Sequence, residues 1–118
     1  MNKTIWIVDD DNAILEVTQI VLEEEGYKVV TIMSEEGLEK MLKTSRPDLL
    51  LLDILLSGSD GREIARKLKK NKKTSGIPIV MMSADIRILE KCRQTIVDDC
   101  IRKPFDIYDL VGKIKNLT

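Results

Sequence analysis

The chain has 118 residues, of which 43% are hydrophobic, 33% charged and 3% aromatic. This length predicts a single domain over residues 1–118, and the formal net charge of −1 gives no basic footprint for direct nucleic-acid binding. The absence of histidine excludes imidazole-dependent catalytic triads, histidine-ligated metals and a phosphohistidine formed on this chain.

The first half of the chain alternates short apolar runs with helical patterns. It predicts strands at 5–8 and 29–32 and a fully buried strand at 49–52. A helix is expected over 13–25, ending before Gly26, with an apolar face that carries Ile14, Val17 and Val21. A second helix is expected after Ser34, whose side chain suits an N-cap; its apolar positions are Leu38, Met41 and Leu42.

The second half continues this alternation. A polar loop with two glycines precedes a predicted helix over about 62–70, and strands are predicted at 79–82 and 100–101. The two remaining helices have apolar faces formed by Leu89, Cys92 and Ile96 and by Ile107, Leu110, Ile114 and Leu117, and Asp106 is expected to cap the second of them. Five strand–helix units with buried strands predict a parallel α/β sheet covered by helices on both faces.

The two cysteines, Cys92 and Cys100, lie eight residues apart. Two thiols cannot form a zinc cage and their spacing is not that of a CxxC motif, so both are expected to be small buried apolar side chains. Apolar runs such as 49–52 are far shorter than the ~20 residues that span a bilayer, and no signal-peptide pattern precedes Asp9. We therefore expect a soluble, cytoplasmic domain without a membrane partner.

Polar residues follow four of the predicted strands, at the sheet edge where ligands bind in open α/β folds. Asp9, Asp10 and Asp11 follow the first strand, Asp53 the third, Ser83 the fourth and Lys103 the fifth. Asp11 is equally well explained as the N-cap of the first helix. Asp53 interrupts an apolar run, and a carboxylate there needs a partner.

Clustered carboxylates need positive charge nearby. Two of them ~4 Å apart repel by about 4 kcal/mol at an effective dielectric constant of 20. Lys103 supplies one positive charge, and oxygen ligands from one or two carboxylates are typical of Mg²⁺. A carboxylate beside such an ion and a lysine is suited to phosphoryl transfer through an aspartyl phosphate.

Five motifs in this order resemble the response-regulator receiver domains of two-component signalling, over residues 3 to about 117. The motifs are Ile7-Val8-Asp9-Asp10-Asp11, Leu51-Leu52-Asp53-Ile54, Asp60-Gly61, Met82-Ser83-Ala84 and Lys103-Pro104-Phe105. The resemblance implies the flavodoxin-like (βα)5 fold with strand order 2-1-3-4-5. It also implies a switch that takes a phosphoryl group from a sensor histidine kinase or a histidine phosphotransfer protein.

The resemblance assigns a role to each matching residue. Asp53 is expected to be the phosphoacceptor, Asp10 and Asp53 direct ligands of Mg²⁺, Asp9 a ligand through water, and the backbone carbonyl of Leu55 a further ligand. The ammonium of Lys103 is expected to pair with a phosphoryl oxygen.

The remaining roles concern switching and turnover. Ser83 is expected to hydrogen-bond the phosphoryl group, and the Lys103–Pro104 bond is expected to be cis. Leu55 and Asp85 are expected to flank the path of the hydrolytic water. The surface of the fourth helix, fifth strand and fifth helix is expected to respond and to bind a partner or a second copy of the chain.

The sequence departs from the family pattern at three places. Cys100 occupies the switch position that is usually aromatic, the segment between Ser83 and Lys103 is about two residues short, and Ser57 stands where proline is common. Cys100 is too small to act as a rotating gate.

Two rival functions remain open at the level of sequence. A magnesium-dependent phosphohydrolase of the haloacid-dehalogenase type would use Asp9 as its nucleophile, but Ala13 stands where that family has threonine and Asp53 would have no role. A degenerate receiver would bind partners without phosphorylation. The sequence is also compatible with a stand-alone regulator or with part of a hybrid kinase or transcription factor.

Overall fold

The computed structural model describes residues 2–92 and 97–118. Within these residues a five-stranded sheet has the order β2-β1-β3-β6-β7, and every neighbouring pair is parallel. Its strands are β1 (Thr4–Val8), β2 (Lys28–Ile32), β3 (Leu49–Asp53), β6 (Ile79–Ser83) and β7 (Asp99–Arg102). The predicted fold class and strand order are thereby confirmed.

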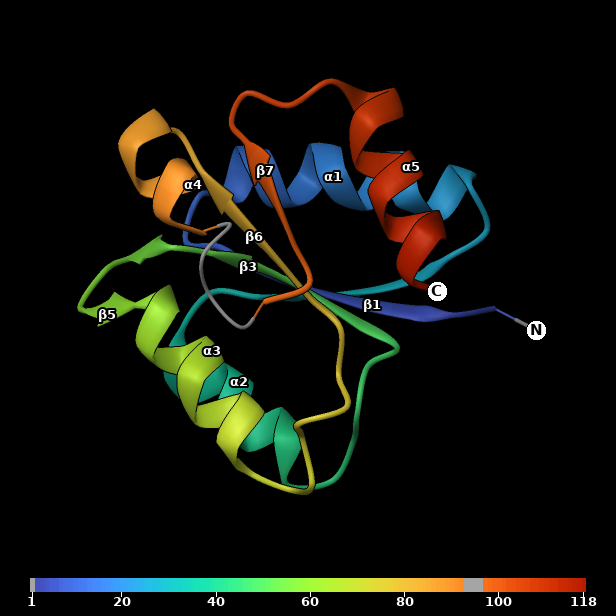
Figure 1. Cartoon of the computed structure of the whole chain (residues 1–118). Coiled ribbons are helices and arrows are strands. Elements are labelled where there is room, and N and C mark those ends of the chain that lie inside the picture. The colour runs from blue at the N-terminus through green and yellow to red at the C-terminus, as the bar shows by residue number, and fades with distance from the viewer. Residues whose placement is uncertain (1, 93–96) are drawn as a thin grey trace.

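Helices cover both faces of this sheet (Figure 1). One face carries α1 and α5, and the other carries α2, α3 and α4. Their bounds are α1 (Asn12–Glu24), α2 (Glu35–Leu42), α3 (Gly61–Lys70), α4 (Ile86–Cys92) and α5 (Ile107–Leu117). Across residues 2–92 and 97–118, none of these helices has the length and apolar character needed to cross a membrane.

The alternation of side chains along the strands builds two cores. On β1, Ile5 and Ile7 pack toward α1 and α5, whereas Trp6 and Val8 pack toward α2 and α3. All residues of β3 are buried, as expected for the central strand of a sheet covered on both faces. The middle of the sheet is therefore a rigid platform for the polar residues at its carboxyl edge.

Side-chain caps fix where several helices begin. Asp11 accepts hydrogen bonds from the first backbone N–H groups of α1, and Ser34 and Asp106 do the same for α2 and α5. Asp60 caps α3 through the N–H of Arg62. The caps predicted at Ser34 and Asp106 are confirmed, and the capping alternative for Asp11 is the one observed.

The predicted apolar face of α1 is correct only in part: Val21 packs against the core and Ile14 is half-buried, but the fully buried positions lie one residue further along the helix. The structure buries Leu15, Thr18 and Leu22, whereas Val17 is 54% exposed. The predicted face of α5 is correct at Leu110 and Ile114, but Ile107 is exposed and Val111 is buried.

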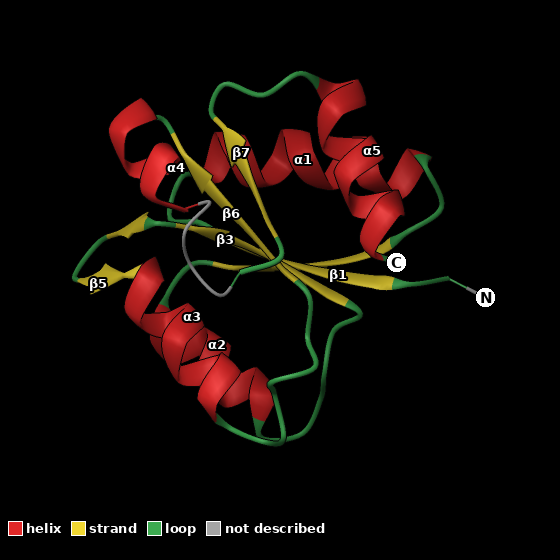
Figure 2. Ribbon diagram, viewed as in Figure 1, coloured by secondary structure: helices red, strands yellow, loops and turns green. Residues whose placement is uncertain are grey.

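The loop after β3 contains a short hairpin that the sequence did not predict. It is formed by β4 (Leu55–Leu56) and β5 (Ser59–Asp60), which pair antiparallel between β3 and α3 (Figure 2). Ile96, predicted on the face of the fourth helix, lies outside the described residues.

Candidate functional site

The predicted site residues are gathered at the carboxyl ends of the central strands. Asp9 directly follows β1, Asp53 is the last residue of β3, and Lys103 directly follows β7. Because β1 and β3 are parallel neighbours, the two carboxylates emerge at the same edge of the sheet. This is the edge at which the sequence predicted a ligand site.

Lys103 joins the two buried aspartates. Its Nζ lies 2.5 Å from Oδ2 of Asp9 and 3.1 Å from Oδ2 of Asp53. The other oxygen of each carboxylate accepts a backbone hydrogen bond, from Asp11 N–H for Asp9 and from Leu55 N–H for Asp53. The expectation that Asp53 needs a partner is confirmed, and its partner is Lys103.

The charges at this site are not balanced by Lys103 alone. Burial raises the pKa of the Asp53 carboxyl, and the negative charge of Asp9 raises it further, whereas Lys103 lowers it. Burial would lower the pKa of Lys103, but hydrogen bonds and charges from Asp9 and Asp53 outweigh burial and raise it. The lysine is therefore held as an ammonium, while ionising Asp53 costs more in the folded protein than in water.

Asp10 completes the acidic cluster from the adjacent loop. Its Oδ2 accepts hydrogen bonds from the hydroxyl of Ser57 at 2.6 Å and from the backbone N–H of Ser57 at 2.9 Å. The hydroxyl bond is the main reason that the pKa of Asp10 lies below its ordinary value, and the backbone bond adds to it. Sequence reasoning noted Ser57 only as a departure from the family pattern and missed this role.

The cluster of Asp9, Asp10 and Asp53 has the donor chemistry of a hard-cation site. Each residue offers a carboxylate oxygen, and these oxygens lie within 4.8 Å of one another. Oxygen-only donors with an excess of negative charge suit a divalent ion such as Mg²⁺ better than a soft transition metal. The cluster can therefore hold a metal.

Gly61 allows the backbone beside Asp53 to pack closely. A Cβ atom at this position would clash with the carbonyl oxygen of Asp53 and would lie 2.8 Å from the Cα of Ile54. The N–H of Gly61 donates to the carbonyl of Ile54 at 2.7 Å. The Asp60-Gly61 motif thus has a physical reason that the sequence alone did not reveal.

Among the described residues, neither Ser83 nor Asp85 has a hydrogen bond to the carboxylates of Asp9, Asp10 and Asp53. Ser83 is buried at the end of β6, and its carbonyl accepts the backbone N–H of Lys103 at 2.9 Å. Its Oγ accepts the N–H of Asp85 at 3.0 Å. The Asp85 carboxylate accepts the N–H of Arg87 at 2.9 Å, and the side chain of Leu55 is 57% exposed.

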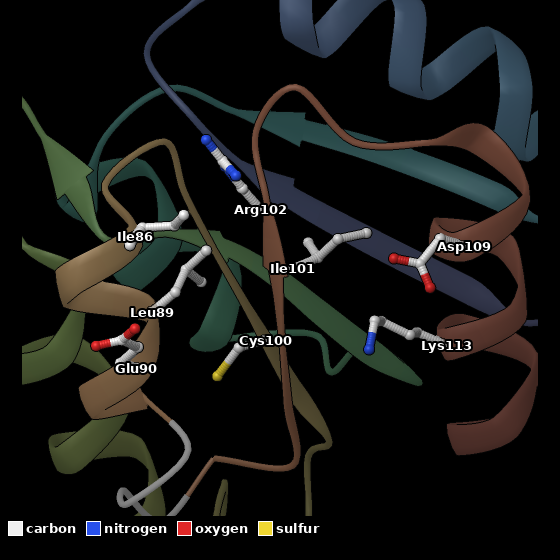
Figure 3. Close-up of a pocket in the computed structure, with 8 residues that line it drawn as sticks. All are labelled: Ile86, Leu89, Glu90, Cys100, Ile101, Arg102, Asp109 and Lys113. Carbon is white, nitrogen blue, oxygen red and sulfur yellow. The ribbon is translucent and has the colours of Figure 1, made fainter.

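A cavity of about 450 Å³ lies between α4, β7 and α5 (Figure 3), and none of Asp9, Asp10 and Asp53 lines it. Cys100 is one of the residues that line it, together with Ile86, Leu89 and Lys113. The cavity therefore lies on the surface of α4, β7 and α5, which the resemblance predicts to respond to phosphorylation.

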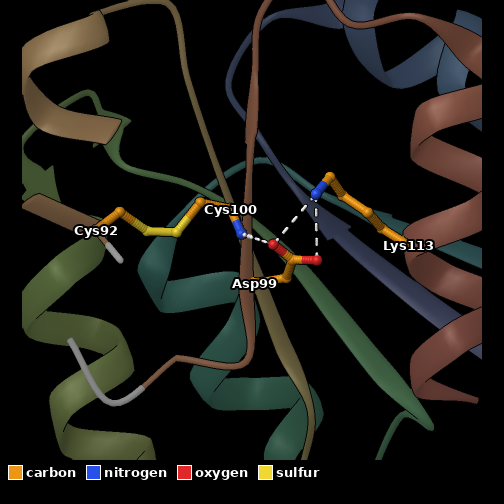
Figure 4. Close-up of a disulfide and its surroundings, with 4 residues drawn as sticks. All are labelled: Cys92, Asp99, Cys100 and Lys113. Carbon is orange, nitrogen blue, oxygen red and sulfur yellow. Dashed lines mark hydrogen bonds and ion pairs between the residues drawn. A yellow bond between two sulfur atoms is a disulfide. The ribbon is translucent and has the colours of Figure 1, made fainter. Parts of the chain in front are cut away.

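The interpretation of the cysteines as two independent apolar side chains is wrong. Cys92 and Cys100 form a disulfide, with Cα atoms 6.5 Å apart, that joins the last residue of α4 to β7 (Figure 4). The bond forms because the fold brings the end of α4 beside the strand. A separation of eight residues gave no sign of that proximity.

Comparisons with known proteins agree with this arrangement. Residues 5–115 match the family described as the response regulator receiver domain. The phosphate regulon transcriptional regulatory protein PhoB of Pseudomonas aeruginosa is 38% identical over 117 residues, which are 98% of this chain and 51% of that protein. The chain spans about half the length of the curated relatives it matches.

Solved structures show the same architecture. The signal receiver domain of a signal transduction histidine kinase from Syntrophus aciditrophicus is 29% identical, with a TM-score of 0.88 over 98% of this chain and 89% of that one. The chemotaxis response regulator CheY4 of Vibrio cholerae is 18% identical and has a TM-score of 0.89 over the whole of both chains, which supports the fold alone.

Proposed function

The chain belongs to the response regulator receiver domains of two-component signalling, and on this premise we propose that Asp53 accepts a phosphoryl group in a magnesium-dependent reaction. The observation that carries the proposal is the bridge of Lys103 between the buried carboxylates of Asp9 and Asp53, with Asp10 in the same cluster. The histidine kinase or phosphotransfer protein that supplies the group must provide the histidine, since this chain has none.

Each residue of the site has a distinct part in this transfer. A carboxylate oxygen of Asp53 attacks phosphorus, the bond from phosphorus to the donor breaks, and the electron pair of that bond leaves with the donor. The ammonium of Lys103 lies between the two carboxylates, where it can pair with a phosphoryl oxygen as charge develops. Held directly by Asp10, Asp53 and the backbone carbonyl of Leu55, and by Asp9 through water, Mg²⁺ would neutralise charge on the phosphoryl oxygens.

Ser83 would form a hydrogen bond with the phosphoryl group on Asp53. Its hydroxyl accepts a hydrogen bond from Asp85 N–H, and none of the described residues accepts a bond from it, so its proton is available to a phosphoryl oxygen. A shift at Ser83 is transmitted to α4, which begins three residues later, and alters the surface of α4, β7 and α5. A partner, or a second copy of the chain in a homodimer, would bind the altered surface.

The wider setting follows from the same proposal. We infer a regulator of the cytoplasmic compartment with no membrane partner and no direct nucleic-acid contact by residues 1–118, which act as one domain. The reaction is self-phosphorylation and self-dephosphorylation, and no separate substrate is turned over. The relatives' lengths make residues 1–118 compatible with part of a longer regulator.

The test is to locate the phosphoryl group. The chain is incubated with an acyl phosphate and Mg²⁺, and its peptides are mapped by mass. We expect the group on the peptide that contains Asp53, none on Asp53→Asn, and normal loading of Asp48→Asn, a matched change at the opposite end of β3. Label on Asp9 would favour the phosphohydrolase, and no label on any peptide would favour the degenerate receiver.

A further inference from the structure

The disulfide joins two elements that both lead directly to the proposed phosphorylation site. The helix α4, which ends at Cys92, begins three residues after Ser83. The strand β7 carries Cys100, and Lys103 follows three residues later, roughly 10 Å along the chain at 3.3 Å per residue. The bond therefore fixes the separation between the helix that follows one site residue and the strand that precedes another.

The opposite side of β7 is tied to α5. Lys113 on α5 lies 3.2 Å from Oδ1 of Asp99, the residue beside Cys100 (Figure 4). A covalent bond to α4 on one side and an ion pair to α5 on the other thus hold the three elements that frame the cavity. The ion pair can break and re-form during a small movement, whereas the disulfide permits no sliding of α4 along β7.

We propose that Cys92 and Cys100 are a reversible thiol–disulfide couple, so that oxidation locks α4 to β7 and reduction releases it. The inference rests on the proposed function, because the movement that it restrains is the response to a phosphoryl group on Asp53. It adds a redox input: the oxidised domain accepts the phosphoryl group, but its surface of α4, β7 and α5 responds far less than in the reduced domain.

Of the two cysteines, Cys100 is the more exposed residue and therefore the point of attack. Cys100 is half-buried and lines the cavity (Figure 3), whereas Cys92 is only 2% exposed. Both pack in the core on the α2–α3–α4 face. A thiolate of an external dithiol attacks Sγ of Cys100, forms a mixed disulfide and releases Cys92 as a thiolate. The second thiol of the reagent then displaces Cys100, so two electrons pass to the protein, both cysteines gain protons, and the dithiol leaves as its own disulfide.

The proposed cytoplasmic location is the reason to expect that the disulfide between Cys92 and Cys100 forms reversibly. Reducing cytoplasm keeps most protein thiols reduced, and disulfides found there are usually transient, catalytic or redox-sensing. A bond between the moving elements would then be open in the resting cell and would form under oxidising conditions.

The test compares both redox states of the whole chain. Wild type and Cys92→Ala are equilibrated with reduced or oxidised dithiothreitol, their free thiols are counted by alkylation, and each is loaded with an acyl phosphate and Mg²⁺. Amide hydrogen exchange of α4 peptides is then measured. We expect oxidation to remove both thiols of wild type in one transition and to leave phosphoryl loading unchanged. The phosphorylation-dependent change in amide exchange of α4 should be about tenfold smaller in the oxidised protein than in the reduced one. Cys92→Ala should respond in both buffers as reduced wild type does.

The proposal is overturned if both thiols stay open to alkylation after oxidation, or if the oxidised and reduced proteins respond equally to phosphorylation. Alanine keeps position 92 small and apolar, and the wild-type comparison decides the matter even if this variant does not fold. Absence of phosphoryl loading in both redox states would instead contradict the proposed function. In that case the restraint of α4 by the disulfide is tested on the unphosphorylated chain. Equal amide hydrogen exchange of α4 in the oxidised and reduced proteins would overturn the proposal.

Discussion

Asp85 is the polar side chain placed two residues beyond Ser83, at the start of α4. Its carboxylate already accepts the N–H of Arg87, so it acts as a local cap as well as a candidate for orienting water. The corresponding position beside Asp53 is Leu55, whose side chain has no donor or acceptor. Any side chain that orients the hydrolytic water from these two positions must therefore be Asp85.

We expect Asp85→Ala to slow the loss of phosphate from the loaded chain by about a hundredfold, the low end of a general acid–base contribution, while loading changes little. Asp85→Asn is the matched control, because an amide keeps both the cap and a hydrogen-bonding group. The decay of phosphorylated protein in excess Mg²⁺ measures both. Equal lifetimes for wild type and Asp85→Ala would show that this side chain does not act on water.

Ser83 carries the proposed coupling through a single hydroxyl. We expect Ser83→Ala to be phosphorylated but to lose most of the phosphate-dependent change in dimerisation or in amide exchange of α4, because alanine cannot donate to a phosphoryl oxygen. Ser83→Thr keeps the hydroxyl and should retain coupling. A fully responsive Ser83→Ala protein would contradict this role.

A contact of a site residue could be predicted from sequence where the chemistry of that residue requires a partner. It could not be predicted where the contact depends on the conformation of a loop or on the packing of a helix. The buried carboxylate of Asp53 required a cation, and Lys103 at the end of another strand was the predicted one. The bonds from Ser57 to Asp10 arise from the hairpin after β3, and the disulfide arises from the packing of α4 beside β7. Neither proximity has a signature in residue spacing.

Among the elements, α1 shows that the spacing of apolar residues does not always identify the buried face of a helix. The predicted face of Ile14, Val17 and Val21 and the buried face of Leu15, Thr18 and Leu22 have the same spacing, offset by one residue. The predicted face is the more apolar, yet the fold buries Thr18, whose hydroxyl has no hydrogen-bond partner among the described residues. Tertiary packing therefore placed the fully buried positions one residue away from the predicted ones.

The start of α3 is restricted by its approach to β3. We expect Gly61→Ala to lower the free energy of unfolding by about 1–3 kcal/mol, the usual cost of overpacking, because the new Cβ must displace the backbone at Asp53 and Ile54. Phosphoryl loading should slow as well, since the phosphoacceptor is part of the displaced segment.

Gly112→Ala is the control for that change. Gly112 lies on α5, and a Cβ atom there meets nothing within 4 Å, so alanine should raise stability by about 0.5–1 kcal/mol through its helix propensity. Thermal melts compare the two variants with wild type. A Gly61→Ala protein as stable as wild type would mean that the close approach is not tight.

At the scale of the whole molecule, the position of the site was predictable from topology. Parallel strands place their carboxyl ends at one edge, so Asp9, Asp53 and Lys103 were expected together although they lie on three separate segments of sequence. Topology does not specify how charge is balanced there. That balance depends on the burial of the carboxylates and on their distances from Lys103, and it can be tested by removing the charge of Asp53.

Asp53→Asn removes one charge from the cluster while keeping the size of the side chain, and Lys103 remains paired with Asp9. In metal-free buffer at neutral pH, we expect the variant to be more stable than wild type by on the order of 1 kcal/mol, because an unfavourable buried charge is gone. The sign follows from the raised pKa of Asp53, whose ordinary value is 3.8. The folded state then binds its proton more tightly than the unfolded state, so stability falls as pH rises above 3.8.

The advantage of Asp53→Asn should therefore shrink as pH falls toward 3.8, where the wild-type carboxyl also becomes neutral. With Mg²⁺ at ten times its Kd, wild type should gain about 1.4 kcal/mol by mass action, and the variant should gain less because a ligand charge is missing. Asp48→Asn makes the same chemical change at the far end of β3 and should respond to Mg²⁺ as wild type does. Thermal melts of the three proteins, in EDTA and in Mg²⁺, measure all of these effects. If Asp53→Asn is the less stable protein without metal, or gains as much from Mg²⁺ as wild type, the carboxylates of Asp9, Asp10 and Asp53 do not act as one site.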